Sequence, residues 1–273
     1  MIKVCVNGPR TPSDHVRISP DPIIAAAEAA AGIAAGAEAV HVHPKSTDGR
    51  DSLRGVDLDR FVVAMRQACP GVPVGVTSGA WAAPAVADRL AAIASWTVLP
   101  DFVSLNWHEE GADDVAALLR KRGIGIEAGI WHTEGLAAWV ASPHRSACLR
   151  ALVEIQAGSG LADAGTGSLA EVAARQLADG VIAREPGLPV LLHGEDEHAW
   201  PMLRLAFAWG MDTRIGLEDT LVLPDGTPAD GNGALVAAAV ELRAAVTGQG
   251  KEEEVRRRSS DPRRAHARAR LPH

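Results

Sequence analysis

The sequence predicts a single (β/α)8 TIM barrel, and two observations lead to that prediction. Short apolar runs rich in β-branched residues alternate with longer helical segments eight times along the chain, which is the pattern of a parallel sheet. The 273 residues have room for eight such units, and a closed barrel has about this length. An open doubly wound sheet is the structural alternative.

The elements can be placed in order along the chain. Strands are expected at residues 2–7, 39–43, 72–77, 102–106, 124–130, 149–155, 190–193 and 213–217. Helices are expected at residues 22–35, 57–68, 84–95, 113–122, 134–141, 168–177, 200–209 and 234–246. The first helix has the clearest start, because Asp21 can cap it and Pro22 suits its first position.

The composition of the chain changes after the eighth helix. A run of lysine, glutamate and arginine begins at residue 251 and gives way to an end rich in arginine and alanine. We therefore expect a catalytic barrel over residues 1–247 and a charged, flexible tail over residues 248–273. A role of the tail in docking nucleic acid or another subunit is the alternative.

Charge and cysteine content exclude several classes of protein. The formal net charge is -7, which argues against general nucleic-acid binding. No apolar stretch is long enough to span a membrane, and the first residues form a strand rather than the apolar core of a signal peptide. Cys5, Cys69 and Cys148 are scattered, as expected of reduced core residues in a cytoplasmic enzyme.

A metal site is indicated by two histidines at the end of the second expected strand. His41 and His43 point to the same face, because side chains alternate along a strand. Glu218 follows the eighth expected strand and offers a carboxylate. Two histidines and one carboxylate form a common ligand set of catalytic Zn²⁺ sites with an open position. The sequence therefore predicts such a site at the carboxyl ends of the strands.

Other polar residues gather at the same end of the barrel, where active sites of such barrels lie. Arg214 could hold a substrate carboxylate or pair with a nearby acid. Ser78 could donate a hydrogen bond to the same carboxylate, or its hydroxyl could only make hydrogen bonds within its own loop. Asn106 is a further substrate-binding candidate. Glu218 and Asp219 are adjacent, so on a strand we expect them to point to opposite sides.

Two glutamates fall inside apolar strands. Glu127 and Glu154 need partners if they point inward, because an unpaired buried charge is costly. They either support the site as residues behind the ligands or pair with a buried arginine.

Several motifs resemble those of the β-keto acid cleavage enzymes, a family that includes 3-keto-5-aminohexanoate cleavage enzymes. H-V-H-P at residues 41–44 and D-G-R at 48–50 resemble the family's H-x-H-x-R-D-x-x-G-R region. R-I-G-L-E-D at 214–219 and L-P-D-G at 223–226 resemble its R-V-G-L-E-D block and L-x-P-x-G sequel. N-G-P-R at 7–10 is similar to its opening N-G-A-R.

The resemblance implies a reaction and roles for these residues. Members condense a β-keto acid with acetyl-CoA to give acetoacetate and a new acyl-CoA. A divalent metal, usually zinc, would be bound by His41, His43 and Glu218. Asp219, with Arg214, would be the general base, and Ser78 would bind the substrate carboxylate. The resemblance further implies a homo-oligomer, a dimer or tetramer.

The chain departs from the family pattern at two places that bear on the substrate. The fourth strand ends S-L-N-W-H at residues 104–108, where the family has a Gly-Thr or Gly-Ser turn. The acidic residue of the first loop, which meets the amino group of 3-keto-5-aminohexanoate, has no clear counterpart here. The substrate of this chain is therefore left open.

Two other classes of function are compatible with the residues. A metal-dependent hydrolase on the same barrel would also use two histidines, normally on the first strand and with further histidines from strands five and six. A metal-binding or ligand-sensing barrel without catalysis is the second alternative. Turnover of β-keto acids with acetyl-CoA separates all three.

Overall fold

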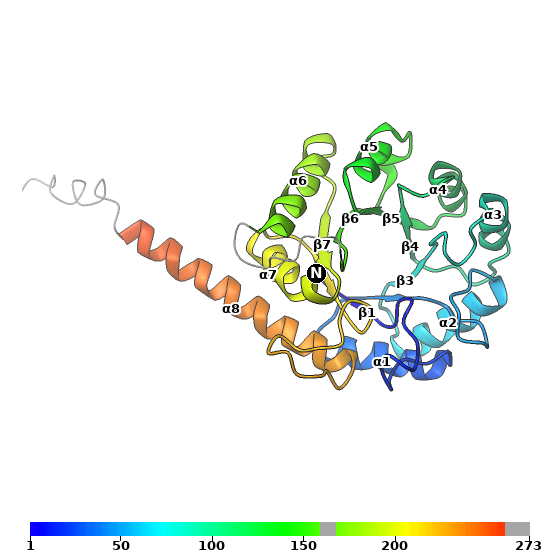
Figure 1. Ribbon diagram of the computed structural model, residues 1–273, viewed down its shortest axis with the longest axis horizontal. Coiled ribbons are helices and arrows are strands. Elements are labelled where there is room, and N and C mark those ends of the chain that lie inside the picture. The colour runs from blue at the N-terminus through cyan, green and yellow to red at the C-terminus, as the bar shows by residue number, and fades with distance from the viewer. Residues whose placement is uncertain (159–167, 260–273) are drawn as a thin grey trace, which may run out of the picture.

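The structure of the protein is a computed structural model that describes residues 1–158 and 168–259. Within those residues, parallel strands pair in the order β7-β6-β5-β4-β3-β2-β1-β8, and a parallel bridge between Leu191 and Asp212 brings β7 beside the start of β8. The predicted (β/α)8 TIM barrel is confirmed, with the strands at the centre and helices around them (Figure 1). The strands are β1 (Ile2–Cys5), β2 (Ala39–Val42), β3 (Val74–Thr77), β4 (Phe102–Asn106), β5 (Gly125–Ile130), β6 (Arg150–Ile155), β7 (Val190–Gly194) and β8 (Thr213–Ile215).

Each strand is followed by a helix that covers the outside of the sheet. The start of the first helix is as predicted, because the Asp21 side chain accepts a hydrogen bond from the Ile23 amide and Pro22 opens the helix. The helices are α1 (Pro22–Ala34), α2 (Gly55–Ala68), α3 (Val86–Ala94), α4 (Ala112–Lys121), α5 (Thr133–Ala141), α6 (Leu169–Arg184), α7 (Ala199–Ala208) and α8 (Asn232–Ser259), with short 3₁₀ turns at Arg145–Ala147 and Asp196–His198.

The barrel interior holds an ion-pair cluster below the carboxyl ends of the strands. Lys3 of β1 and Glu127 of β5 are fully buried and paired with each other, and Arg150 Nε of β6 lies 3.2 Å from Glu127 Oε1. Of the two roles open to Glu127, the structure shows pairing with buried basic residues. The cluster places ion-paired charges inside the barrel, below the carboxyl ends of the strands.

The chain turns sharply after β8, which ends at Ile215 rather than at residue 217. A Cβ atom on Gly216 would lie 1.9 Å from the carbonyl oxygen of Cys5 in β1, so only glycine allows this close approach. The amides of Asp219 and Thr220 then donate back to the Gly216 carbonyl, at 2.9 and 3.0 Å. Glu218 and Asp219 both follow the strand in a turn, so the alternation of side chains along a strand does not apply to them.

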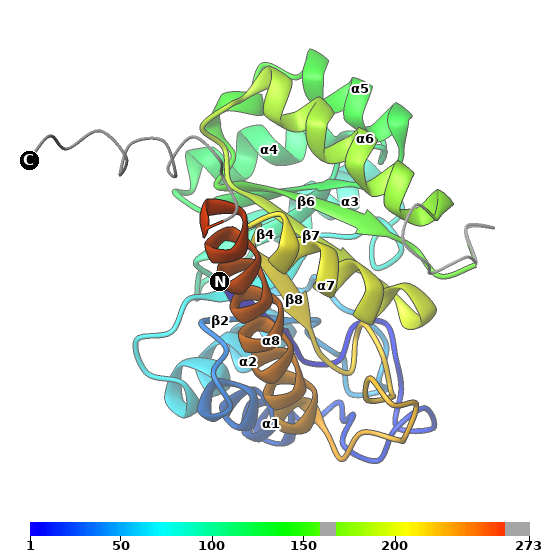
Figure 2. The same ribbon diagram turned by 90° about the vertical axis from the view of Figure 1, so that its left-hand side faces the viewer.

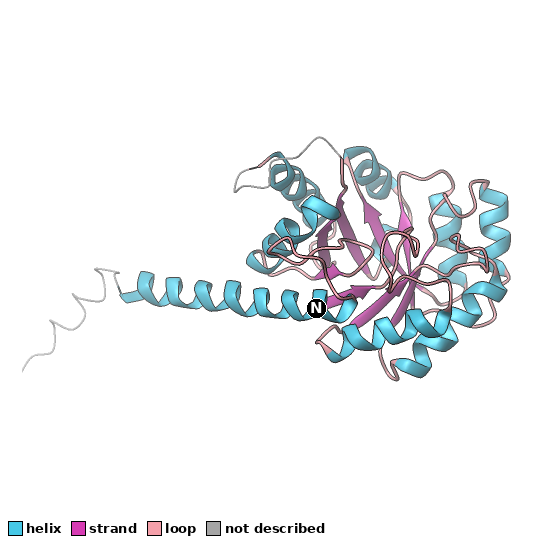
Figure 3. Ribbon diagram, turned by 60° about the horizontal axis from the view of Figure 1, so that its bottom comes forward, coloured by secondary structure: helices cyan, strands magenta, loops and turns pink. Residues whose placement is uncertain are grey.

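Helix α8 is longer than the sequence predicts. The expected helix covered residues 234–246, whereas α8 runs from Asn232 to Ser259. Its first part packs against α1 and α7 and completes the ring of helices (Figure 2), and its second part projects away from the barrel (Figure 3). Residues 260–273 of the expected tail lie outside the described residues. None of the helices described is both long and apolar enough to cross a bilayer.

Candidate metal centre and active site

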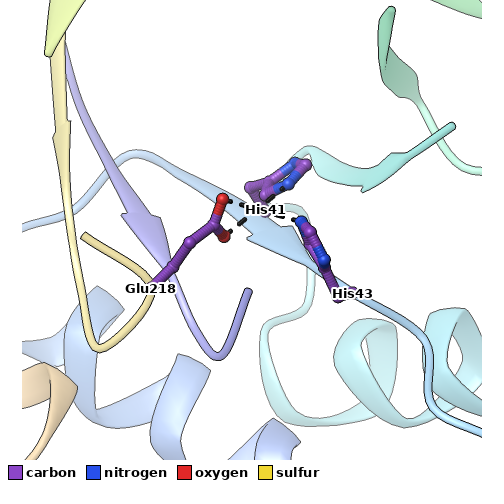
Figure 4. A group of neighbouring side chains, drawn as sticks. All are labelled: His41, His43 and Glu218. Carbon is purple, nitrogen blue, oxygen red and sulfur yellow. Dashed lines mark ion pairs between the residues drawn. The ribbon is translucent and has the colours of Figure 1, made fainter. Parts of the chain in front are cut away.

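His41, His43 and Glu218, here called the metal triad, come together at the carboxyl ends of the strands (Figure 4). His41 lies in β2, His43 follows directly after it, and Glu218 lies in the turn after β8. His41 Nε2 is 3.8 Å from Glu218 Oε2, and His43 Nε2 is 3.6 Å from Glu218 Oε1. Tetrahedral Zn²⁺ with bonds of about 2.0–2.1 Å separates its ligand atoms by roughly 3.4 Å. The observed separations are close to that spacing.

Two buried atoms of the metal triad have no hydrogen-bond partner among the described residues: His41 Nδ1 and Glu218 Oε2. Buried polar atoms in proteins are nearly always partnered, and the exceptions call for an explanation. With two imidazoles and one carboxylate buried around a common point, the donor set fits a divalent cation that takes nitrogen and oxygen ligands.

Asp51 holds His43 in position from the loop after β2. Its Oδ2 atom accepts hydrogen bonds from His43 Nδ1 and from Trp81 Nε1, each at 2.8 Å, and Lys45 Nζ donates to its other oxygen. Because Nδ1 is engaged by Asp51, Nε2 of His43 is the nitrogen that faces Glu218. A carboxylate behind a ligating histidine is a recurrent feature of metal sites.

Asp51 was not among the site residues predicted from the sequence. The signal was its place eight residues after His43, in a loop that returns to the strand end through an isolated bridge between Lys45 and Asp51. That return cannot be read from a single chain, because loop geometry has no periodic pattern.

Burial and neighbouring charges shift the pKa values of the two histidines in opposite directions. Burial lowers the pKa of His41 well below its usual value, so this imidazole is neutral and ready to bind a cation. Burial alone would also lower the pKa of His43, but the Asp51 and Glu218 carboxylates raise it to about 9. A cation that binds at His43 Nε2 therefore has to displace a proton.

Arg214 links the metal triad to Asp219. Its Nη2 atom lies 2.9 Å from Glu218 Oε1 and 2.8 Å from Asp219 Oδ1. Its Nε atom donates to Asp219 Oδ1 at 2.9 Å and to His193 Nδ1 at 3.0 Å. Asp219 is fully buried, and its Oδ2 has no hydrogen-bond partner among the described residues. One guanidinium thus holds two adjacent carboxylates in fixed positions.

A cavity of about 230 Å³ opens beside these residues. The metal triad and Arg214 line it together with Asn106, one of the substrate-binding candidates. Ser78 is not among the described residues that line it; its buried hydroxyl donates to the Ser104 carbonyl at 2.8 Å. The structure therefore brings five of the seven predicted site residues to one cavity, with Asp219 directly behind Arg214 and Ser78 turned away.

The opposite side of the cavity holds residues that the sequence analysis did not assign to the substrate. Glu154 and Gln156 from β6 and its end, and Glu195 after β7, line this side; we call these three residues the far wall. Trp81 and Trp131 line the cavity as well. The sequence showed that the far-wall residues lie at strand ends, but many other polar residues lie at strand ends as well.

Comparison with known families gives one match over most of the chain. The family model of the beta-keto acid cleavage enzymes matches residues 1–257. No curated protein matches the sequence.

Solved structures with the same fold include two complexes of ObcA. The binary complex of ObcA with oxaloacetate has 18% sequence identity and a TM-score of 0.66, over 86% of this chain and 64% of that chain. The ternary complex of ObcA with a C4-CoA adduct and oxalate has 16% identity and a TM-score of 0.63, over 84% of this chain and 63% of that chain. The 3-dehydroquinate dehydratase of Geobacillus kaustophilus has 11% identity and a TM-score of 0.56, over 90% and 91%. At these identities the likeness shows the barrel fold, and this chain spans about 64% of the length of ObcA.

Proposed function

This chain belongs to the beta-keto acid cleavage enzyme family, and from that membership we propose that it condenses a β-keto acid with acetyl-CoA. The products are acetoacetate and a new acyl-CoA. The observation that carries the proposal is the meeting of the metal triad and the Arg214–Asp219 pair at one cavity. Both groups lie at the carboxyl ends of the strands, where barrels of this fold carry their active sites.

The complexes of ObcA support the substrate class. One is a complex with oxaloacetate, a keto acid, and another holds a CoA adduct. They show a keto acid and a CoA-linked group bound by a protein of the same fold. The choice of zinc, a homo-oligomeric state and a cytoplasmic location remain predictions, and the identity of the β-keto acid stays open.

The metal triad would hold the divalent cation that the family resemblance implies. Such a cation, when bound, supplies a Lewis acid that draws electron density from the keto oxygen. The residues prepare for it by burial and by the hydrogen bond from His43 to Asp51, which keeps the imidazole ring from turning.

The Arg214–Asp219 pair is the proposed base. Arg214 faces the cavity, and its Nη2 contacts Asp219 Oδ1 at 2.8 Å. A proton from the carbon between the two carbonyls passes to Asp219, while Arg214 keeps the carboxylate in place. We propose that Asn106 and Arg214, which both line the cavity, meet the substrate carboxylate. Ser78 would do so only after its hydroxyl leaves the Ser104 carbonyl.

The remaining steps need no electron carrier. The carbanion of the keto acid attacks the thioester carbonyl of acetyl-CoA, and the CoA thiolate leaves. The thiolate then attacks the original keto carbon. The carbon–carbon bond breaks to release the new acyl-CoA, and the acetoacetate carbanion takes the proton back from Asp219.

A panel of β-keto acids tests the proposal. The zinc-loaded protein is incubated with each acid and acetyl-CoA, and acetoacetate and acyl-CoA are followed by mass. We expect both products in equal amounts with at least one acid, and none with the His41→Ala variant. Consumption of lactones or amides without acetyl-CoA would instead support the hydrolase alternative. That alternative expects a histidine at the end of β6, where the structure places Glu154.

A further inference from the structure

The far wall of the cavity is acidic, and from it we infer that this enzyme sorts β-keto acids by the charge of their tails. Glu195 and Glu154 exclude acids that carry a second carboxylate and favour tails that donate hydrogen bonds. The inference rests on the proposed function, since it assumes that the keto acid end lies at the metal triad.

The geometry of the barrel sets the direction of the substrate. The strands follow one another around the ring in chain order, so β6 lies opposite β2. His41 and His43 belong to β2 and its end, whereas Glu154 and Gln156 belong to β6 and its end. A substrate whose keto acid end lies at the metal triad therefore extends its tail toward the far wall.

Among the described residues, the charged side chains around the cavity lie close to opposite charges, with one exception. Arg214 is matched by Asp219, at 2.8 Å. His193 is matched by Glu154, whose Oε2 lies 3.3 Å from His193 Nε2. The Glu195 carboxylate has no hydrogen-bond or ion-pair partner among residues 1–158 and 168–248. The far wall thus presents one unmatched acid to whatever fills the cavity.

The protonation of Glu195 agrees with this lack of a partner. Burial, and then the negative charge of Glu154, raise the pKa of Glu195 to about 7, although Arg214 and His193 act in the opposite direction and Asp219 adds to the rise. A second anion at this wall would raise the cost of ionising Glu195 further. A hydroxyl or ammonium group would instead offer the hydrogen bond that the carboxylate lacks.

The inference separates this chain from its structural relatives. ObcA is described in complex with oxaloacetate, which carries two carboxylates. A carboxylate on the tail would here face Glu195, whose carboxylate has no basic partner among the described residues. Like charges in such a poorly hydrated space repel strongly.

Four keto acids of matched length test the charge filter: 6-hydroxy-3-oxohexanoate, 6-amino-3-oxohexanoate, 3-oxoheptanoate and 3-oxohexanedioate. Their dissociation constants are measured by calorimetry on the zinc-loaded protein without acetyl-CoA, so that binding is read independently of turnover. We expect the hydroxyl and ammonium acids to bind about tenfold or more tightly than the dicarboxylate, with the methyl acid between.

Two variants assign the effect to the far wall. Glu195→Gln keeps the size of the side chain and removes its charge, so binding of the dicarboxylate should improve about tenfold. The methyl acid should bind almost unchanged. Glu197→Gln removes the same charge two residues away, from a half-exposed side chain outside this cavity, and should leave all four constants unchanged. Glu154→Gln, like Glu195→Gln, should lower the dissociation constant of the dicarboxylate.

The outcomes separate the inference from the proposed function. Equal affinity of the native protein for the hydroxyl acid and the dicarboxylate, or an unchanged ratio in Glu195→Gln, would overturn the charge filter. Absence of binding by all four acids would overturn it as well. Acetoacetate formation with acetyl-CoA is measured separately, so its failure would count against the proposed function and leave the ranking of affinities to decide the filter.

Discussion

Asp51 and Glu195 show two opposite uses of a carboxylate around one cavity. Asp51 has three partners and holds His43 still, whereas Glu195 has none among the described residues and faces the cavity. The partnered acid supports His43, and we infer that the unpartnered acid meets the tail of the substrate. The sequence alone could not separate these roles, because both residues are acids in loops that follow a strand.

Replacement of Asp51 by asparagine should weaken zinc binding by about 10–100-fold, because it removes the negative charge behind His43. Zinc affinity is measured by competition with a chromogenic chelator. Asp48→Asn in the same loop is the control, since Asp48 is exposed and pairs with the exposed Arg50. Equal zinc affinity in Asp51→Asn and the native protein would contradict the role of Asp51.

The adjacent acids Glu218 and Asp219 should separate by function. Glu218→Ala should lose the metal and all activity, because it removes one of three ligands. Asp219→Asn should keep the metal but lose activity by about 10²–10⁴-fold, since it removes the proposed base. Metal content is measured by mass spectrometry beside the rate. Full zinc content in Glu218→Ala, or native turnover in Asp219→Asn, would refute the respective assignment.

The pH dependence of stability should report Glu195. A carboxyl whose pKa rises from 4.5 to about 7 on folding stabilises the fold at low pH, and this contribution is lost as pH rises from 4.5 through 7. Glu195→Gln has no such loss, so without metal it should melt at a higher temperature than the native protein at pH 8. At pH 4.5 and below the two should melt alike. If the difference in melting temperature between the two proteins were the same at every pH, ionisation of Glu195 would not destabilise the fold.

At the scale of elements, the repeating strand–helix pattern predicted the order and type of the barrel segments, because periodicity is a local property. The paired histidines of β2 were placed correctly for the same reason. The turn after β8 was not, because it depends on the contact between Gly216 and the Cys5 carbonyl, two residues far apart in the chain. The ends of α8 also escaped the pattern, since its later part carries no apolar stripe.

Gly216→Ala tests the turn. The added Cβ would meet the Cys5 backbone, which cannot move aside, so we expect a loss of about 1–3 kcal/mol in the free energy of unfolding and weaker zinc binding. Urea titration and chelator competition measure the two effects. Gly187→Ala is the control, because a Cβ there meets nothing within 4 Å. An unchanged zinc affinity in Gly216→Ala would show that the turn tolerates the methyl group.

For the whole molecule, the charged cluster of Lys3, Glu127 and Arg150 crosses the barrel interior between β1, β5 and β6. Lys3 and Glu127 lie on strands that are far apart in the chain, so their pairing depends on closure of the ring. Glu127 and Arg150 lie opposite each other on the neighbouring strands β5 and β6. The metal triad lies at the other end of the same interior. The two clusters therefore depend on one closed barrel but have no residue in common.

Glu127→Gln should destabilise the barrel by about 3–5 kcal/mol, because it leaves the buried Lys3 without its counter-charge. Stability is measured by urea unfolding of the metal-free protein. Lys3→Met combined with Glu127→Leu should recover part of the loss, since neither charge then remains unpaired. No difference between the single and double variants would contradict the pairing as the source of stability.

The metal triad also has a consequence for biosynthesis. Two of its members leave the ribosome with the second strand, but the third belongs to the last strand–helix unit. Through most of translation, a nascent chain therefore offers only the two imidazoles as ligands. Two ligands bind a cation more weakly than three. Capture of the proposed metal ion would therefore be a late event, because all three residues are present only after the last described strand has been synthesised.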